Sequence, residues 1–223
     1  MEIVLRLLDF ADTYMPFLIL LIFLSVWKFM PRREILLFAY LVISFVIFGI
    51  TIIMGVTHHN NMALYHFFSL VELILMVYYL LDIMDWRKKR LLFFLISTVY
   101  FIFWLLNLIY WEPLKMFNSN SAGLANLIIL ALCMSYMLVL SKSDEILYFQ
   151  RLPSFWIAGA FLVYCAVSFL VILAFKYFLE NNLMQEAIDI WYIQNIANIV
   201  KFTMIAIGIL CYRRPFIQNH SLS

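Results

Sequence analysis

Seven long runs of apolar residues follow one another along the chain, separated by short polar connections. Each run is continuous rather than alternating, which favours membrane-spanning helices over the strands of a β-barrel. About 20 mostly apolar residues are enough for a helix to cross a bilayer. The predicted spans cover residues 13–30, 35–54, 62–83, 91–110, 122–140, 155–179 and 188–212. The pattern therefore predicts an all-α, polytopic protein, with a single seven-helix transmembrane domain over residues 1–223 and no soluble domain.

Composition supports the same class of protein. Of the 223 residues, 66% are hydrophobic and only 13% are charged, and the mean hydropathy is +0.99. Such a chain has too few polar side chains to cover a water-exposed surface, so we expect it to be embedded in the lipid bilayer. The first 16 residues lack a basic stretch followed by a small-residue cleavage site, so we do not expect a removable signal peptide.

Basic residues are concentrated at alternate ends of the predicted spans. The connections after the first, third and fifth spans and the C-terminal tail carry most of them: Lys28, Arg32, Arg33, Arg87, Lys88, Lys89, Arg90, Lys142, Arg151, Arg213 and Arg214. The opposite side carries Arg6, Lys115 and Lys176. Because lysine and arginine accumulate on the cytoplasmic side, we predict an outside N-terminus and an inside C-terminus in the plasma (inner) membrane. Basic residues at span ends are topological anchors, so no nucleic-acid partner is expected.

Two ionisable side chains fall in the middle of predicted spans, Glu72 in the third and Lys201 in the seventh. A charge at the centre of a bilayer costs roughly 2.5 to 3.5 kcal/mol on insertion scales, so such residues mark a functional site by default. Their opposite signs can offset that cost. A structural salt bridge that fixes helix register is the alternative.

Polar residues accompany both charges at helical spacing. In the third span Tyr65, Ser69, Glu72, Met76 and Tyr79 share one face, and in the seventh Trp191, Asn195, Asn198 and Phe202 do so, with Gln194 and Lys201 in a neighbouring column. We predict an outward-open polar cavity that binds a small ligand through Glu72, Lys201, Asn198, Asn195, Gln194, Ser69, His66, Tyr65 and Trp191. The amides can alternatively serve as interhelical hydrogen bonds, each worth on the order of 1 kcal/mol.

Metal and catalytic sites are not predicted. His58 and His59 are adjacent in a connection, and the sequence has no HxxxH or HExxH pair that places two ligands on one helix face. Ser69 lies one turn before Glu72, but no base and orienting partner accompany it, so no catalytic residue is assigned and an enzyme is not favoured. The three cysteines predict no disulfide framework.

Two segments carry a resemblance to a known family. The stretches NNMALYHFFSLVELIL and IWYIQNIANIVKFTMIAIG resemble those of an uncharacterised family of bacterial seven-helix inner-membrane proteins. The matching positions are Tyr65, His66, Glu72, Trp191, Asn195 and Asn198. In that family a histidine is common where Gln194 stands, and Lys201 is not a recurring position. The resemblance implies a polar centre of the same kind and no known reaction.

A lysine in the last helix and a carboxylate in the third also resemble the Schiff-base lysine and counterion of rhodopsins. That resemblance implies retinal as a cofactor bound to Lys201, with Glu72 as counterion. The chain departs from the microbial rhodopsins at Ala197, where they have an aspartate, and it lacks their Trp-x-x-Tyr-Pro cluster in the sixth helix.

We therefore predict a seven-helix sensor or receptor-like module. A small ligand in the outer cavity would shift helix packing, and a separate cytoplasmic-side signalling protein would read the change. Three alternatives stay open: a retinal protein, a proton-coupled transporter and an intramembrane enzyme. The spans show no internal repeat and no pair of Gly/Pro-broken helices of the usual carrier kind. An oligomer is also left open.

Overall fold

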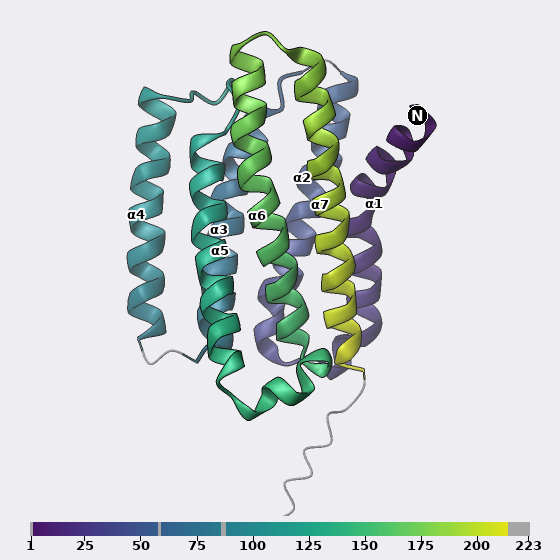
Figure 1. The fold of residues 1–223 in the computed structure, drawn as a ribbon, viewed down its shortest axis with the longest axis vertical. Helices are drawn as coiled ribbons and strands as arrows, with labels where there is room; N and C mark the ends of the chain where they lie inside the picture. Colours follow the sequence, from purple (N-terminus) through teal and green to yellow (C-terminus); the bar gives the residue numbers. More distant parts are fainter. Residues whose placement is uncertain (1, 58, 86–87, 214–223) are drawn as a thin grey trace, which may run out of the picture.

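The fold is a bundle of seven long helices, seen in a computed structural model that describes residues 2–57, 59–85 and 88–213 (Figure 1). The helices are α1 (Glu2–Val26), α2 (Ile35–Val56), α3 (Met62–Ile83), α4 (Lys89–Tyr110), α5 (Asn120–Ser141), α6 (Pro153–Glu180) and α7 (Met184–Cys211). Short 3₁₀ turns occur at Trp27–Phe29, Arg32–Glu34 and Asp144–Arg151. His58, Arg87 and Arg214 lie outside the described residues.

All seven helices are long and apolar enough to cross a membrane, which indicates a multi-pass membrane protein. The predicted spans coincide with them closely, which confirms the helical architecture. The largest differences are at α1, which runs from Glu2 to Val26 instead of over residues 13–30, and at the start of α7, which is Met184 instead of residue 188. The stretch before residue 13 is helical and continuous with the first span.

The beginning of α1 leans away from the bundle (Figure 1). Pro16 lies inside this helix, and a proline there removes one backbone hydrogen bond and crowds the preceding turn, which bends a helix. Asp12 and Thr13 lie just before the bend and reach the interior of the bundle.

Helices α6 and α7 form the closest pair of the bundle, and α7 also packs along α1. Gly208 permits the close approach, because a Cβ atom placed on it would lie 3.0 Å from the Pro153 carbonyl oxygen. Small residues allow membrane helices to approach in this way. By contrast, α4 packs mainly against α3 and α5 at one edge of the bundle (Figure 1), and exposes Leu91, Phe94 and Ile109, as expected of a lipid-facing helix.

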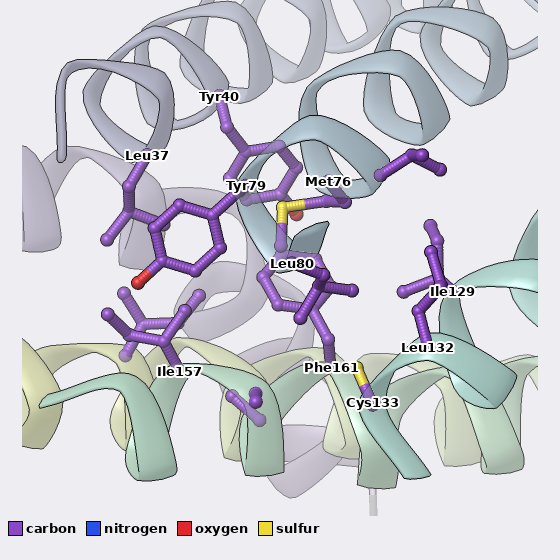
Figure 2. Close-up of a cluster of buried hydrophobic side chains, with 14 of the residues drawn as sticks. Leu37, Tyr40, Met76, Tyr79, Leu80, Ile129, Leu132, Cys133, Ile157 and Phe161 are labelled. Atoms are coloured by element: carbon purple, nitrogen blue, oxygen red, sulfur yellow. The ribbon is translucent and has the colours of Figure 1, made fainter. Parts of the chain in front are cut away.

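The two halves of the bundle differ in packing. The half next to the α1–α2, α3–α4 and α5–α6 connections, which we call the packed end, contains a buried apolar cluster in which α2, α3, α5 and α6 converge (Figure 2). Its members include Leu37, Tyr40, Met76, Tyr79, Leu80, Ile129, Leu132, Cys133, Ile157 and Phe161. The other half, which we call the cavity end, is bounded by the α2–α3, α4–α5 and α6–α7 connections and is hollow.

Candidate functional site

A cavity of about 520 Å³ occupies the cavity end, between α1, α2, α3, α5, α6 and α7. Seven of the nine residues predicted to bind a ligand line it: Tyr65, Ser69, Glu72, Trp191, Gln194, Asn195 and Asn198. The polar faces of α3 and α7 therefore turn toward a shared space. His66 and Lys201 do not line it, although both are fully buried.

Glu72 forms part of the floor of the cavity and leaves only 6% of its surface exposed. The Tyr40 hydroxyl donates a hydrogen bond to Glu72 Oε1 at 3.1 Å. Lys201 Nζ in turn donates to the Tyr40 hydroxyl oxygen at 2.9 Å. Among the ion pairs of the described residues, none joins Glu72 directly to Lys201. The two charges are thus joined through one tyrosine.

The Lys201 ammonium lies within a set of aromatic rings. Its Nζ atom is 3.7 Å from the centroid of Tyr164, 4.6 Å from that of Phe202, 5.6 Å from that of Tyr40 and 5.9 Å from that of Phe161. A desolvated cation over an aromatic face gains about 2 kcal/mol. Tyr164 also lines the cavity, so it separates the cation from the open space above. Lys201 is therefore connected to Glu72 through Tyr40 and is not itself part of the cavity wall.

Asp12 is a second carboxylate in the cavity wall, and it is not among the residues that the sequence predicts for the site. Asn198 Nδ2 donates to Asp12 Oδ1 at 2.5 Å, which joins α7 to α1. Hydropathy places the start of the first span at residue 13, directly after this aspartate. The continuation of α1 as a helix before residue 13 is what carries Asp12 into the wall.

The cavity amides also connect helices. Gln194 Nε2 donates to Ser168 Oγ on α6 at 2.7 Å. Asn118, which precedes α5, donates from Nδ2 to Ser69 Oγ at 2.9 Å and to the Tyr65 carbonyl oxygen at 3.0 Å. Lining a cavity and hydrogen bonding between helices, which are alternatives at the sequence level, therefore occur together here.

His66 faces away from the cavity, toward the α4–α5 connection. Its Nε2 lies 3.2 Å from the Met116 carbonyl oxygen, and its own carbonyl oxygen accepts a hydrogen bond from Trp104 Nε1 at 2.9 Å. His59 is exposed in the α2–α3 connection. Within the described residues no three His, Cys, Asp or Glu side chains gather to hold a metal ion.

Glu112 organises the rim beside the cavity and is only 3% exposed. It accepts hydrogen bonds from Ser119 Oγ, from Asn107 Nδ2 at 3.1 Å, from the Asn120 backbone N–H at 2.9 Å and from Lys176 Nζ at 3.2 Å. Burial alone would raise the pKa of Glu112, but these hydrogen bonds together outweigh it and lower the pKa below its ordinary value. The network fixes the α4–α5 connection to α6. Nothing in the sequence predicts it, because Glu112 and Lys176 are 64 positions apart.

A third buried carboxylate, Glu34, lies at the packed end and is 1% exposed. Its Oε1 atom accepts a hydrogen bond from Tyr212 Oη at 2.6 Å and from Tyr79 Oη at 3.5 Å, and it lies 3.4 Å from Arg33 Nε. This cluster ties the start of α2 to α3 and to the residue that follows α7. The Glu34 carboxylate therefore connects the end of α7 to the start of α2 at the packed end. Near the middle of the bundle, Tyr40 of α2 connects Lys201 of α7 to the Glu72 carboxylate of α3.

The chain matches no protein-family model, no curated protein and no solved structure. The resemblance to the bacterial seven-helix inner-membrane family is therefore neither supported nor opposed by these comparisons.

Retinal does not fit the surroundings of Lys201. A Schiff base needs open space next to Nζ for a long polyene, whereas this nitrogen is enclosed by four rings and bonded to Tyr40. Lys201 also has no exposed surface and is not part of the cavity wall. The rhodopsin-like pair of charges is present in the chain, but Lys201 Nζ is enclosed by four aromatic rings and does not face the cavity.

Proposed function

We propose that the protein is a receptor-like sensor of the plasma (inner) membrane, with its cavity open to the outside. A small ligand enters the cavity, and a separate signalling protein on the cytoplasmic side reads the resulting change in helix packing. The volume of about 520 Å³ lies within the usual range for small-molecule sites. The cavity wall combines apolar side chains with many polar ones, among them Glu72, Asn195 and Asn198, which can orient a ligand.

The proposed orientation is supported by the distribution of basic residues. Lys28, Arg32, Arg33, Lys142 and Arg151 all belong to connections at the packed end. At the cavity end, Lys176 is already engaged by the buried Glu112 carboxylate. The positive-inside tendency therefore favours the packed end on the cytoplasmic side, which leaves the cavity facing outward.

The observation that carries the proposal is the position of Glu72. This carboxylate lines the cavity and at the same time accepts the Tyr40 hydrogen bond that leads to Lys201. A ligand that binds Glu72 changes the partners of a group that holds α2, α3 and α7 together. Any such ligand with different affinities for two arrangements of these helices shifts the balance between them.

A sensor agrees better with the packing than a transporter does. Below Glu72 the interior is filled by Met76, Tyr79 and Leu80, none of which is more than 1% exposed. The second cavity found in the described chain, of about 380 Å³, lies sideways between α4, α5 and α6 and does not lead to the packed end. Transport would require a path through this packed half. A ligand-driven rearrangement requires only small shifts of the helices.

Ligand binding can be tested by thermal unfolding of the purified full chain in lipid nanodiscs with a panel of cationic, neutral and anionic small molecules. Ala125 lines the cavity and is 2% exposed, whereas Ala131 is exposed on the same helix. We expect at least one compound to raise the melting temperature of the wild type and of Ala131→Phe but not of Ala125→Phe. Equal stabilisation of all three proteins, or of none, would refute the proposal.

Transmission to the packed end can be followed at Cys211, which is partly exposed at the end of α7, while Cys133 and Cys165 are buried. A compound that binds in the cavity is expected to change the rate at which a maleimide labels Cys211. The rate should stay constant in Ala125→Phe. A bound ligand that leaves the wild-type rate unchanged would argue against a sensor.

A further inference from the structure

The charged side chains that line the cavity are all acidic. Asp12 and Glu72 are part of the wall, and the lining residues of the described chain include no lysine, arginine or histidine. Lys201, a described cation close to the cavity, lies behind the rings of Tyr40 and Tyr164. A ligand in this space therefore meets the Glu72 and Asp12 side chains directly, and reaches the charge of Lys201 only through other side chains.

A second, independent feature is a buried acceptor that lacks a donor. Asn198 lines the cavity and is 5% exposed. Its Nδ2 atom donates to Asp12 Oδ1 on α1. The remaining atom, Asn198 Oδ1, is buried and has no hydrogen-bond partner. One turn earlier, the buried Gln194 Oε1 also has none. What these groups lack is a donor.

An aromatic cluster lines the same cavity on the side away from Glu72. The Phe117 and Phe175 ring centroids are 4.7 Å apart, and those of Phe175 and Trp191 are 4.8 Å apart. All three residues belong to the cavity wall. Aromatic faces attract cations and also accommodate an apolar body. The wall therefore offers an apolar surface together with carboxylates and an unsatisfied carbonyl.

We propose that the ligand is an organic amine, bound as its ammonium ion, and this rests on the cavity being the ligand site of the proposed sensor. The ammonium group donates hydrogen bonds to the Glu72 carboxylate and to Asn198 Oδ1. Its apolar or aromatic body packs against Phe117, Phe175 and Trp191. An alcohol could satisfy the carbonyl but would not neutralise charge. An anion would meet the two carboxylates with no basic lining residue to hold it.

The test uses four probes and the full chain in nanodiscs of neutral phosphatidylcholine. Phenethylamine, 2-phenylethanol and 3-phenylpropanoate share a ring and a short chain but end in an ammonium, a hydroxyl and a carboxylate, and tryptamine supplies a larger amine. We expect the amines to bind at least about tenfold more tightly than the other two probes, because hydrogen bonds between ions are stronger than neutral ones. Ala125→Phe should abolish this binding, and Ala131→Phe should not.

Substitutions of single carboxylates test which negative charge binds the ammonium group. Glu72→Gln is expected to weaken amine binding by about tenfold or more and to change 2-phenylethanol binding little. Glu186→Gln, which removes an exposed carboxylate on α7, should have no effect. If Glu72→Gln does not fold, Asp12→Asn removes the other lining carboxylate, and a smaller weakening of amine binding is expected because the ammonium is bonded to Glu72 and Asn198.

Several results would overturn the amine assignment. One is binding of the alcohol or the carboxylate as tight as that of the amines, and another is full amine affinity in the charge-removing variants. No binding by either amine is a third. Binding of a neutral or anionic compound that Ala125→Phe abolishes would leave the proposed sensor in place and reject only the amine. Failure of the whole panel to bind would reject both.

Discussion

The Lys201 ammonium lies 2.9 Å from the Tyr40 hydroxyl oxygen, and this contact makes a tyrosine of α2 the link between the two mid-span charges. A phenol suits the position because it accepts from an ammonium and donates to a carboxylate at the same time. The Tyr40 side chain is 1% exposed, so water does not compete for either hydrogen bond. The hydrogen-bonded link between Glu72 of α3 and Lys201 of α7 therefore depends on Tyr40 of α2.

Removing one of the two charges is expected to be worse than removing both. Glu72→Gln or Lys201→Met alone leaves a buried charge without its counterpart, which typically costs about 3 to 5 kcal/mol. The double variant leaves no unpaired charge, so it should be less destabilised than either single variant and well below the sum of the two. The free energy of unfolding of all four proteins, measured by denaturant titration in one detergent, gives the coupling. Strict additivity would show that Tyr40 does not connect the two residues.

Gly208→Ala should destabilise the packed end. The new Cβ atom would lie 3.0 Å from the Pro153 carbonyl oxygen and 3.1 Å from Trp156 Cβ, so α6 and α7 would have to separate. Overpacking of this kind costs roughly 1 to 3 kcal/mol. Gly49→Ala is the matched control, because nothing lies within 4 Å of its Cβ position. A melting temperature that falls for Gly49→Ala but not for Gly208→Ala would contradict the close approach of these helices.

Glu112 should make stability depend on acidic pH. Burial raises the pKa of Glu112, but its hydrogen bonds outweigh that effect, so the folded pKa lies below the unfolded one. The stabilisation is therefore complete above the unfolded value near 4.5 and is lost as pH falls through the folded pKa. The free energies of unfolding of wild type and Glu112→Gln should differ most near neutral pH, by about 1 to 3 kcal/mol, and the difference should shrink as the pH falls below 4.5. A constant difference across this range would be the opposite result.

Membrane orientation can be measured with two matched lysine substitutions. Lys115 is exposed in the α4–α5 connection at the cavity end, and Lys142 is exposed just after α5 at the packed end. In a variant without the three native cysteines, Lys115→Cys should react with a membrane-impermeant maleimide in intact cells. Lys142→Cys should react only after permeabilisation. The reverse pattern would place the cavity on the cytoplasmic side.

Hydropathy and helical period predict much of this molecule, because the bilayer requires long apolar helices and buries polar faces inside the bundle. The seven helices and the cavity-facing positions of α3 and α7 follow from those two patterns. Helical period assigns residues to a face, but it does not determine how far each helix rotates against its neighbours. For that reason Lys201, which the sequence places in the cavity, lies behind Tyr164 instead.

The missed residues share a physical cause. Tyr40 is an aromatic residue in an apolar run, so nothing in its local sequence marks it as the partner of two charges. Asp12 lies just outside the hydropathy maximum of the first span. The Glu112–Lys176 pair joins segments distant in sequence. Each of these contacts depends on the three-dimensional arrangement of the helices, which a single sequence does not encode in any short pattern.

The ring of Tyr164 lies between the cavity and Lys201, which has no exposed surface. Beneath Glu72, the side chains of Met76, Tyr79 and Leu80 are at most 1% exposed. If the protein is the outward-open sensor proposed above, a ligand would exchange above this packed layer. The charge of Lys201 would then be held at mid-depth without an open path from one side of the bundle to the other.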